Sequence, residues 1–298
     1  MIKIKNTKVL ANFSLILCAF IWGFAFVAQS KGMDYVQPFT FQSIRSFLGF
    51  LTLLPVVAGI KRTESKTKNK VENKKKLVTG GILCGIVLCI ASCFQQFGIL
   101  YTTVGKAGFI TSMYLVLVPV FSIFLKRKVG WKTWLSVLIA MGGMYLLSMN
   151  EGFSISKGDQ LVAVCAVCFA LHIMLVDHYA PHVNGVKLSC IQFLVSGILS
   201  GIGMVFMEKP QVTLIFQAAL PLLYAGVLSC GAAYTLQIIG QKYANPTTAT
   251  LLMSFESVFS LLGGAMLLHQ IPTAREAVGC VLVFAAVLLS QVSGKNKS

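Results

Sequence analysis

The sequence predicts an all-α integral membrane protein with ten transmembrane helices, arranged as two inverted five-helix repeats. Three observations lead to this prediction: an apolar composition, ten long apolar segments, and matching residues in the two halves. Hydrophobic residues make up 56% of the 298 positions and charged residues only 11%, whereas soluble domains carry about 25% charged residues. We therefore expect no large water-soluble domain.

Ten segments of the chain are suited to crossing a membrane. A helix needs roughly 20 apolar residues to span a hydrocarbon core about 30 Å thick, because its backbone groups must all be hydrogen-bonded within the segment. The segments are 10–30, 38–60, 77–102, 106–125, 133–149, 160–176, 188–207, 219–240, 247–268 and 277–293. The connections between them are short, and the longest polar interruption is 61–76.

The net charge of +16 would be typical of a nucleic-acid binder if the protein were soluble, but here its distribution predicts topology. If the N-terminus is cytoplasmic, the basic residues on the inside lie at 3–8, 61–76, 126–132, 187, 242 and 295–297. The basic residues on the outer side of the membrane are then Lys31, Lys106, Lys157, Lys209 and Arg275. This asymmetry predicts a multi-pass protein of the cytoplasmic (plasma) membrane with both termini cytoplasmic. We expect contact with membrane lipid and none with nucleic acid.

The cysteines and histidines do not predict a metal site or a cofactor. All nine cysteines lie in predicted spans, where they act as small apolar side chains. Cys165 and Cys168 form one C-x-x-C pair without further ligands at metal-binding spacing, so packing is favoured. His178 and His182 are spaced i, i+4, but Pro181 interrupts a helix between them.

The two halves match in the order of their residues. At a shift of 147 positions Arg45 falls on Gln192, and at a shift of 141 Gln96 falls on Gln237. At a shift of 138, Glu256 falls on Val118, and this change of shift predicts one extra helical turn within 106–114. We therefore predict two repeats, 1–149 and 150–298. Because each has an odd number of spans, the second is inverted relative to the first, which is typical of transporters.

The same residues resemble a known family. The Trp22-Gly23 start, Arg45, the stretch 98–108, and the segments 172–181 and 243–259 are similar to EamA-type proteins of the drug/metabolite transporter (DMT) superfamily. The resemblance implies a central cavity lined by helices one to four and six to nine, with helices five and ten at the periphery. It also implies export of an amino acid or related metabolite.

Four ionisable residues lie in or at the ends of predicted spans, where a charge costs about 2.5–3.5 kcal/mol at the helix centre. Glu256 could carry a proton or pair with a substrate amine, and the alternative is a structural ion pair with Arg45. Arg45 could bind a substrate carboxylate, although a structural role is favoured. His172 could contact substrate or simply pack. Lys106 ends a span or attracts substrate at the outer mouth.

Uncharged polar and aromatic residues complete the candidate site. Gln96 and Gln237, at matching positions, could hydrogen-bond a polar solute or join helices. Trp22, Tyr101 and Tyr114 could form aromatic walls, with Tyr234 beside them, or could lie at the membrane interfaces.

Spacing also predicts where helices approach closely and where they bend. The motifs 81–85 and 197–201, each with glycines four apart, and the pairs 142–143 and 263–264 permit close helix packing. Pro119 and Pro246 are expected to break or kink helices where two moving halves need a hinge.

We therefore predict a secondary transporter that moves a small-molecule solute by alternating access, with no catalytic residues. The alternatives are an integral membrane enzyme acting on lipid and a non-catalytic membrane subunit. The enzyme is disfavoured because the chain has no H-E-x-x-H or G-x-S-x-G motif. ATP hydrolysis is unsupported because Leu100 and Ala107 break the Walker A pattern around Lys106. A homodimer is compatible with the sequence.

Overall fold

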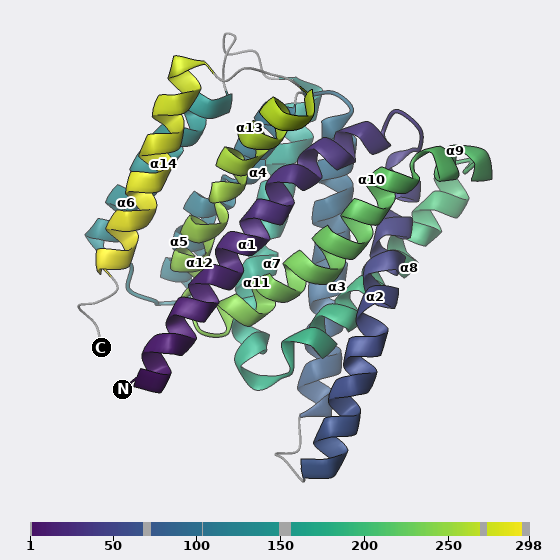
Figure 1. Ribbon diagram of the computed structural model, residues 1–298, viewed down its shortest axis with the longest axis horizontal. Coiled ribbons are helices and arrows are strands. Elements are labelled where there is room, and N and C mark those ends of the chain that lie inside the picture. The colour runs from purple at the N-terminus through teal and green to yellow at the C-terminus, as the bar shows by residue number, and fades with distance from the viewer. Residues whose placement is uncertain (1, 68–72, 103, 149–155, 269–272, 294–298) are drawn as a thin grey trace.

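The computed structural model describes residues 2–67, 73–102, 104–148, 156–268 and 273–293, and within these residues it contains helices and no strands (Figure 1). The all-α prediction is confirmed for this part of the chain. The elements are α1 Ile2–Gly32, α2 Pro38–Thr67, α3 Lys74–Ile99, α4 Val104–Thr111, α5 Tyr114–Phe124, α6 Trp131–Ser148, α7 Lys157–Tyr179, η1 Ala180–His182, α8 Gly185–Met207, α9 Val212–Gln217, α10 Ala219–Leu223, η2 Tyr224–Ala233, α11 Tyr234–Gln241, α12 Pro246–Met253, α13 Phe255–Leu268 and α14 Ala274–Ser293.

Eight segments of the described chain are long and apolar enough to cross a membrane, so the molecule is a multi-pass membrane protein. They are Thr7–Gly32, Pro38–Ile60, Lys74–Ile99, Lys106–Phe124, Lys157–His182, Gly185–Met207, Ala219–Gln241 and Pro246–Leu267. The other two predicted spans, 133–149 and 277–293, correspond to helices α6 and α14, which are not among the eight. The count of ten spans therefore stays a prediction.

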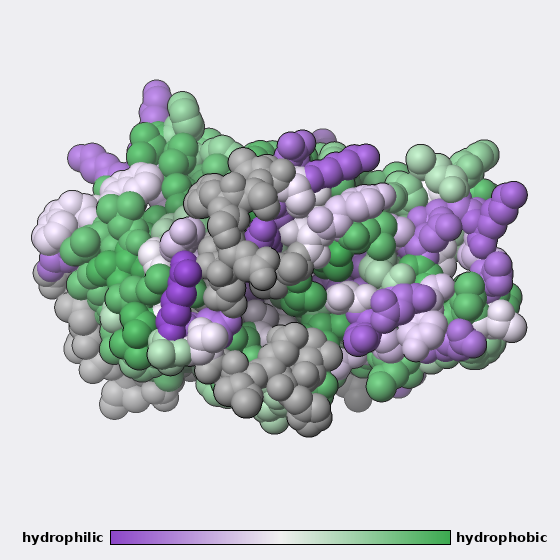
Figure 2. All heavy atoms as spheres, turned by 90° about the horizontal axis from the view of Figure 1, so that it is seen from above, coloured by the Kyte–Doolittle hydropathy of each residue, from purple (hydrophilic) through white to green (hydrophobic). Residues whose placement is uncertain are grey.

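The helices form one elongated bundle in which distant parts of the sequence lie side by side (Figure 1). Helix α2 packs on α8, α3 packs on α7 and α8, and α1 packs on α13. Helices α6 and α14 pack on each other at one edge. Helix α1 begins and α14 ends on the same side of the bundle. Seen from above the view of Figure 1, hydrophilic side chains lie among hydrophobic ones on this face of the molecule (Figure 2).

Glycines bring two of these helix pairs close together, as their spacing predicts. A Cβ atom on Gly85 of α3 would lie 2.7 Å from Cβ of Val195 and 2.8 Å from the carbonyl oxygen of Gln192, both on α8. A Cβ atom on Gly143 of α6 would lie 2.7 Å from the carbonyl oxygen of Gly279 on α14. Only glycine permits these distances, so the packing of α3 on α8 and of α6 on α14 depends on it.

Two predicted spans are broken near their middles. One consists of α4 and α5, with Ser112 and Met113 between them, and the other of α12 and α13, with Ser254 between them. The hydroxyl of Ser254 donates to the carbonyl oxygen of Leu251 at 2.8 Å, and such bonds compete with the helical backbone pattern. Both breaks lie deep in the bundle, because Ser112 and Ser254 are fully buried.

The positions of these breaks correct the predicted alignment of the halves. Helix α4 begins at Val104 and α12 at Pro246, 142 residues apart, and both helices have 8 residues. The extra turn predicted within 106–114 is therefore absent. At the shift of 142, the residue that matches Glu256 is Tyr114, not Val118. The predicted shift of 138 differs from 142 by four residues, which is about one helical turn. Residues matched at either shift therefore lie on the same face of the helix.

Pro246 does not kink a helix, contrary to the prediction. It is the first residue of α12, where a proline is well tolerated because the N–H it lacks has no helical partner. The side chain of Asn245 caps this start by accepting from the backbone N–H of Thr248 at 2.8 Å. Pro119 does lie inside a helix, α5.

Candidate functional site

A pocket of about 450 Å³ lies at the centre of the bundle, between helices of both halves of the chain. Its walls come from α1, α2, α3, α4, α5, α7, η2, α11 and α13. The residues that line it are Trp22, Phe26, Gln29, Arg45, Gln95, Thr111, Tyr114, Phe169, Ile173, Ser229, Tyr234, Gln237 and Glu256. Apolar and aromatic side chains with a few polar groups line it, as is usual for small-molecule sites.

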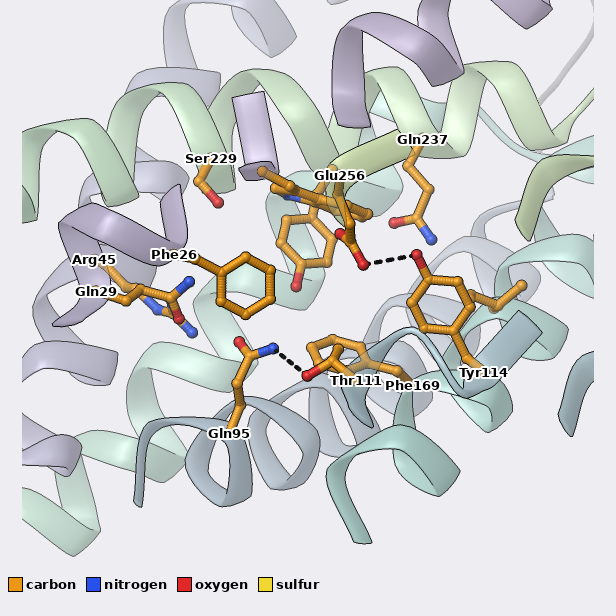
Figure 3. Close-up of a pocket in the computed structure, with 13 residues that line it drawn as sticks. Phe26, Gln29, Arg45, Gln95, Thr111, Tyr114, Phe169, Ser229, Gln237 and Glu256 are labelled. Atoms are coloured by element: carbon orange, nitrogen blue, oxygen red, sulfur yellow. Dashed lines mark hydrogen bonds between the residues drawn. The ribbon is translucent and has the colours of Figure 1, made fainter. Parts of the chain in front are cut away.

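Arg45 occupies one end of the pocket, next to Gln29 (Figure 3). The side chain is 4% exposed. Its Nε donates to Oε1 of Gln42 at 2.6 Å, and its Nη1 donates to Oε1 of Gln29 at 2.8 Å. The ring of Phe41 lies 5.7 Å from the guanidinium carbon. Arg45 is therefore held by neutral groups.

Glu256 lies across the pocket from Arg45, beside Tyr114 (Figure 3), and we call these two sides the Arg45 end and the Glu256 end. Glu256 is 3% exposed and is the second residue of α13, directly after the break at Ser254. Its Oε1 accepts from Tyr114 Oη at 2.9 Å and from Ser112 Oγ at 3.0 Å. Both donors belong to the other broken span, so this carboxylate joins the two breaks.

The predicted alternative of an ion pair between Arg45 and Glu256 is wrong. Within the described residues, Lys31 pairs with Asp34 and Arg127 with Asp177, but no ion pair joins Arg45 to Glu256. The two pocket charges lie at opposite ends, each held by uncharged partners (Figure 3). The pocket therefore presents both signs of charge to its contents.

Aromatic and amide side chains connect the two charged ends. The rings of Trp22 and Tyr234 pack edge to face with centroids 4.7 Å apart, and Gln95 Nε2 donates to Thr111 Oγ1 at 3.2 Å (Figure 3). Within the described residues, Trp22 Nε1 and Gln237 Oε1 are buried without a hydrogen-bond partner. Buried polar groups normally have partners, so these two atoms are available to a bound solute.

A π-helical segment, η2, supplies part of the wall. It runs from Tyr224 to Ala233, between α10 and α11. Its residue Ser229 lines the pocket, and so does Tyr234, the first residue after it. Segments of this kind are rare and occur frequently at functional sites. The corresponding helix of the first half, α3, is a continuous α-helix.

Five of the nine predicted site residues line the pocket: Glu256, Arg45, Gln237, Trp22 and Tyr114. Two others are buried behind it. His172 is fully buried, with Nε2 3.1 Å from Gln192 Oε1. Gln96 is also fully buried, and its Nε2 donates to the backbone oxygen of Gln29 at 3.3 Å.

The remaining two predicted residues, Tyr101 and Lys106, do not line the pocket. Tyr101 is 54% exposed at the end of α3, and the Nζ of Lys157 lies 5.6 Å from the centre of its ring. Lys106 lies in the first turn of α4. Their positions at the ends of the helices fit the alternative roles that the sequence leaves open, at the interface and at the end of a span.

Several lining residues were missed: Phe26, Gln29, Thr111, Phe169, Ile173 and Ser229. A signal existed for Gln29, an amide inside the first predicted span, like the amides chosen in spans three and eight. No pattern in the sequence distinguishes the others from packing residues, because apolar and hydroxyl side chains are common in every span.

No group of three or more potential metal ligands lies together among the described residues. Asp177, next to His178, instead accepts from Nη1 of Arg127 at 2.5 Å. Helix α7 ends at Tyr179 and is followed by the short turn η1, so His178 and His182 do not share a continuous α-helix.

Comparisons with known proteins agree with this architecture. The EamA-like transporter family matches residues 9–149 and 156–291. An uncharacterized transporter of Archaeoglobus fulgidus is 31% identical over 283 residues, covering 95% of this chain and 86% of its own. The uncharacterized transporter YoaV of Bacillus subtilis is 20% identical over 282 residues, covering 93% and 94%. A crystal structure shares the fold with a TM-score of 0.77 at 18% identity, over 97% of this chain and 99% of the other. The chain belongs to the EamA-like transporter family and is a multi-pass membrane transporter.

Proposed function

We propose that this protein is a secondary transporter that moves a small organic solute by alternating access through the central pocket. The chain has ten spans in two inverted halves, 1–149 and 150–298, with both termini in the cytoplasm and the body in the plasma membrane. The solute is an amino acid or a related metabolite, and the direction is export. The observation that carries the proposal is a buried pocket between the halves that holds an unpaired arginine and an unpaired glutamate.

The helix contacts support two halves of inverted orientation. Helix α3 packs on α7 and α1 on α11, so the third helix of each half meets the first of the other. Helix α1 packs on α13 and α7 on α4, so the first helix of each half meets the fourth of the other. Such reciprocal contacts are expected of halves related by a pseudo-two-fold axis. The start of α1 and the end of α14 lie on the same side of the bundle, which agrees with an even number of spans between them (Figure 1).

Alternating access is supported by the way the pocket is built. Arg45 and Tyr114 belong to the first half, and Glu256 and Gln237 to the second. A movement of one half against the other would therefore change the pocket and its exits together. Broken helices at the binding site are a recurring feature of secondary transporters, and here both breaks meet at Glu256.

The choice of an amino acid is supported by the charges and walls of the pocket. A solute with a carboxylate and an ammonium group can satisfy Arg45 and Glu256 at once, while aromatic walls accept its apolar part. Export is supported by the resemblance of the sequence to EamA-type exporters. Proton coupling through Glu256 or His172 and transport without a proton are the two alternatives for the driving force.

Counter-exchange in proteoliposomes tests the proposal. Vesicles that contain the purified protein would be loaded with single L-amino acids, nucleosides or sugars, and uptake of the same labelled compound would be measured. We expect saturable uptake that is accelerated by internal amino acids, and none in vesicles without protein. Acceleration by nucleosides or sugars alone would exclude the amino-acid assignment, and no acceleration by any compound would exclude transport of these classes.

A further inference from the structure

The guanidinium of Arg45 has hydrogen-bonding capacity that the protein does not use. Arginine has five N–H donors and no acceptor. Two are taken, by Oε1 of Gln42 and by Oε1 of Gln29, and no other described residue accepts from the remaining three. Arg45 nevertheless lines the pocket. A forked donor set with its charge uncompensated therefore faces the solute space.

The two amides that hold Arg45 are themselves fixed by other helices. Gln42 Nε2 donates to Ser46 Oγ and to Ser196 Oγ, both at 3.2 Å, so its oxygen is turned toward Arg45. The backbone oxygen of Gln29 accepts from Gln96 Nε2 at 3.3 Å. Gln29, Gln42 and Gln96 are all less than 5% exposed. The position of the guanidinium is thus set by α1, α3 and α8 as well as by its own helix, α2.

Because Gln29 and Gln42 are uncharged, they hold the guanidinium of Arg45 without neutralising its charge. A glutamate at position 29 or 42 would hold the guanidinium equally well, but it would neutralise the charge. An amide oxygen supplies the hydrogen bond and leaves the charge in place. A buried cation without a counterion is unfavourable, so an anionic ligand is strongly favoured at this end of the pocket.

The chemistry of the pocket selects a carboxylate as that anion. A planar carboxylate can accept two parallel N–H bonds from arginine. A phosphate can do the same, but it carries close to two negative charges near pH 7, and Glu256 in the same pocket would repel the second. A solute with one carboxylate at the Arg45 end and one ammonium group at the Glu256 end leaves the pocket neutral overall.

We infer that Arg45 is the carboxylate-binding group of this transporter, and that Gln29 and Gln42 are positioning residues that orient the guanidinium without neutralising it. This inference rests on the proposed function, because it names which part of the solute each end of the pocket binds. It assigns roles to two glutamines that the sequence did not single out.

The test compares acids with analogues that lack the carboxylate. Proteoliposomes would be assayed for uptake of leucine, phenylalanine and glutamine, each beside its carboxamide and its decarboxylated amine. For at least one acid we expect a half-saturating concentration about tenfold or more below that of its amide. β-Alanine and phosphoethanolamine form a second pair, in which the carboxylate should be taken up and the phosphate should not.

The decisive variant is Gln29→Glu, which keeps the hydrogen bond to Arg45 and adds a negative charge. We expect the acid-to-amide preference to fall toward one in Gln29→Glu and in Arg45→Gln, and to fall partly in Gln42→Ala. Gln241→Ala is the matched control, because Gln241 is a buried amide on α11 that bonds the Ile173 backbone and does not line the pocket. It should keep the wild-type preference.

A purely structural role of Arg45 would lower uptake of acid and amide together, and that result would overturn the inference. Equal uptake of acid and amide by the wild type would also overturn it while leaving the transport proposal intact. Thermal unfolding of the detergent-solubilised protein with the same compounds provides a readout independent of flux. Stabilisation by the acid alone, lost in Gln29→Glu, would support the inference even if no exchange were seen, whereas equal stabilisation by acid and amide would contradict it.

Discussion

The two ends of the pocket are built in different ways. At one end, Arg45 is held by Gln29 and Gln42, which lie on α1 and α2 of the same half of the chain. At the other end, the described residues that donate to Glu256 of the second half both belong to the first half, Ser112 and Tyr114. The direct partners of Arg45 therefore belong to its own half, although Gln42 also bonds Ser196 of the second half, whereas both partners of Glu256 belong to the opposite half.

This difference predicts different roles for Arg45 and Glu256, although the two side chains are almost equally buried. A movement between the halves need not separate Arg45 from Gln29 or Gln42, although it would strain the bond from Gln42 to Ser196, so this end is suited to holding a solute throughout the cycle. The same movement must stretch or break the bonds to Glu256, because they cross between the broken helices. The Glu256 end is thus suited to linking solute binding to the conformational change.

Glu256→Gln should give the largest effect at the Glu256 end. Glutamine keeps an oxygen that can accept from Tyr114 and Ser112, but it removes the negative charge that balances Arg45. We expect counter-exchange of amino acids to fall by about tenfold or more, because an ammonium group then loses its ionic partner. If protons move through this residue, the pH dependence of exchange should flatten as well.

Glu276→Gln is the matched control, since Glu276 lies in the first turn of α14, bonds Thr273 and does not line the pocket. It should exchange at the wild-type rate. Normal exchange with unchanged pH dependence in Glu256→Gln would remove both the binding and the coupling roles of this carboxylate.

Tyr114→Phe should have an intermediate effect and a different kinetic signature. It removes one of the two hydrogen bonds to Glu256 Oε1 and keeps the ring. A lost hydrogen bond to a charged group corresponds to roughly 1.5–3 kcal/mol, and because Ser112 still donates to Glu256 we expect the lower value, about tenfold. Because this bond crosses the halves, we expect the maximal exchange rate to change more than the half-saturating concentration, as measured in the same vesicles.

Tyr224→Phe provides the comparison for this prediction. Tyr224 Oη donates to the backbone oxygen of Ile21 at 3.0 Å, so it also joins the halves, but it does not line the pocket. An equal loss of rate in both variants would show that any hydrogen bond between the halves matters, and that Glu256 has no special place among them.

The parts of this molecule that sequence predicted well are those with a large energetic cost. Apolar length predicted the helices, because a backbone in lipid must bond to itself. The cost of an ionisable group in a span singled out Arg45 and Glu256, and both line the pocket. Close packing at Gly85 and Gly143 followed from glycine spacing for the same kind of reason.

The parts that sequence predicted poorly are those where several positions are nearly equivalent in energy. A slip of one helical turn keeps every side chain on its own face, which is why Glu256 was matched with Val118 instead of Tyr114. A tyrosine suits an interface as well as a cavity, so Tyr101 and Tyr114 could not be separated by pattern. Gln29 and Gln42 gain their roles only from contact with Arg45, which requires the fold.

The smallest effect is expected midway between the two ends, at Gln95. Its Nε2 donates to Thr111 Oγ1 at 3.2 Å, so the bond joins two helices of the first half and involves no charge. In Gln95→Leu we expect the half-saturating concentration of an amino acid to rise about twofold to fivefold, the lower part of the range of one neutral hydrogen bond, with equal effects on acid and amide. Thr111→Val removes the partner, and the double variant should cost little more than either single change. A loss in Gln95→Leu as large as that in Glu256→Gln would mean that the neutral wall, and not the two charged ends, dominates recognition.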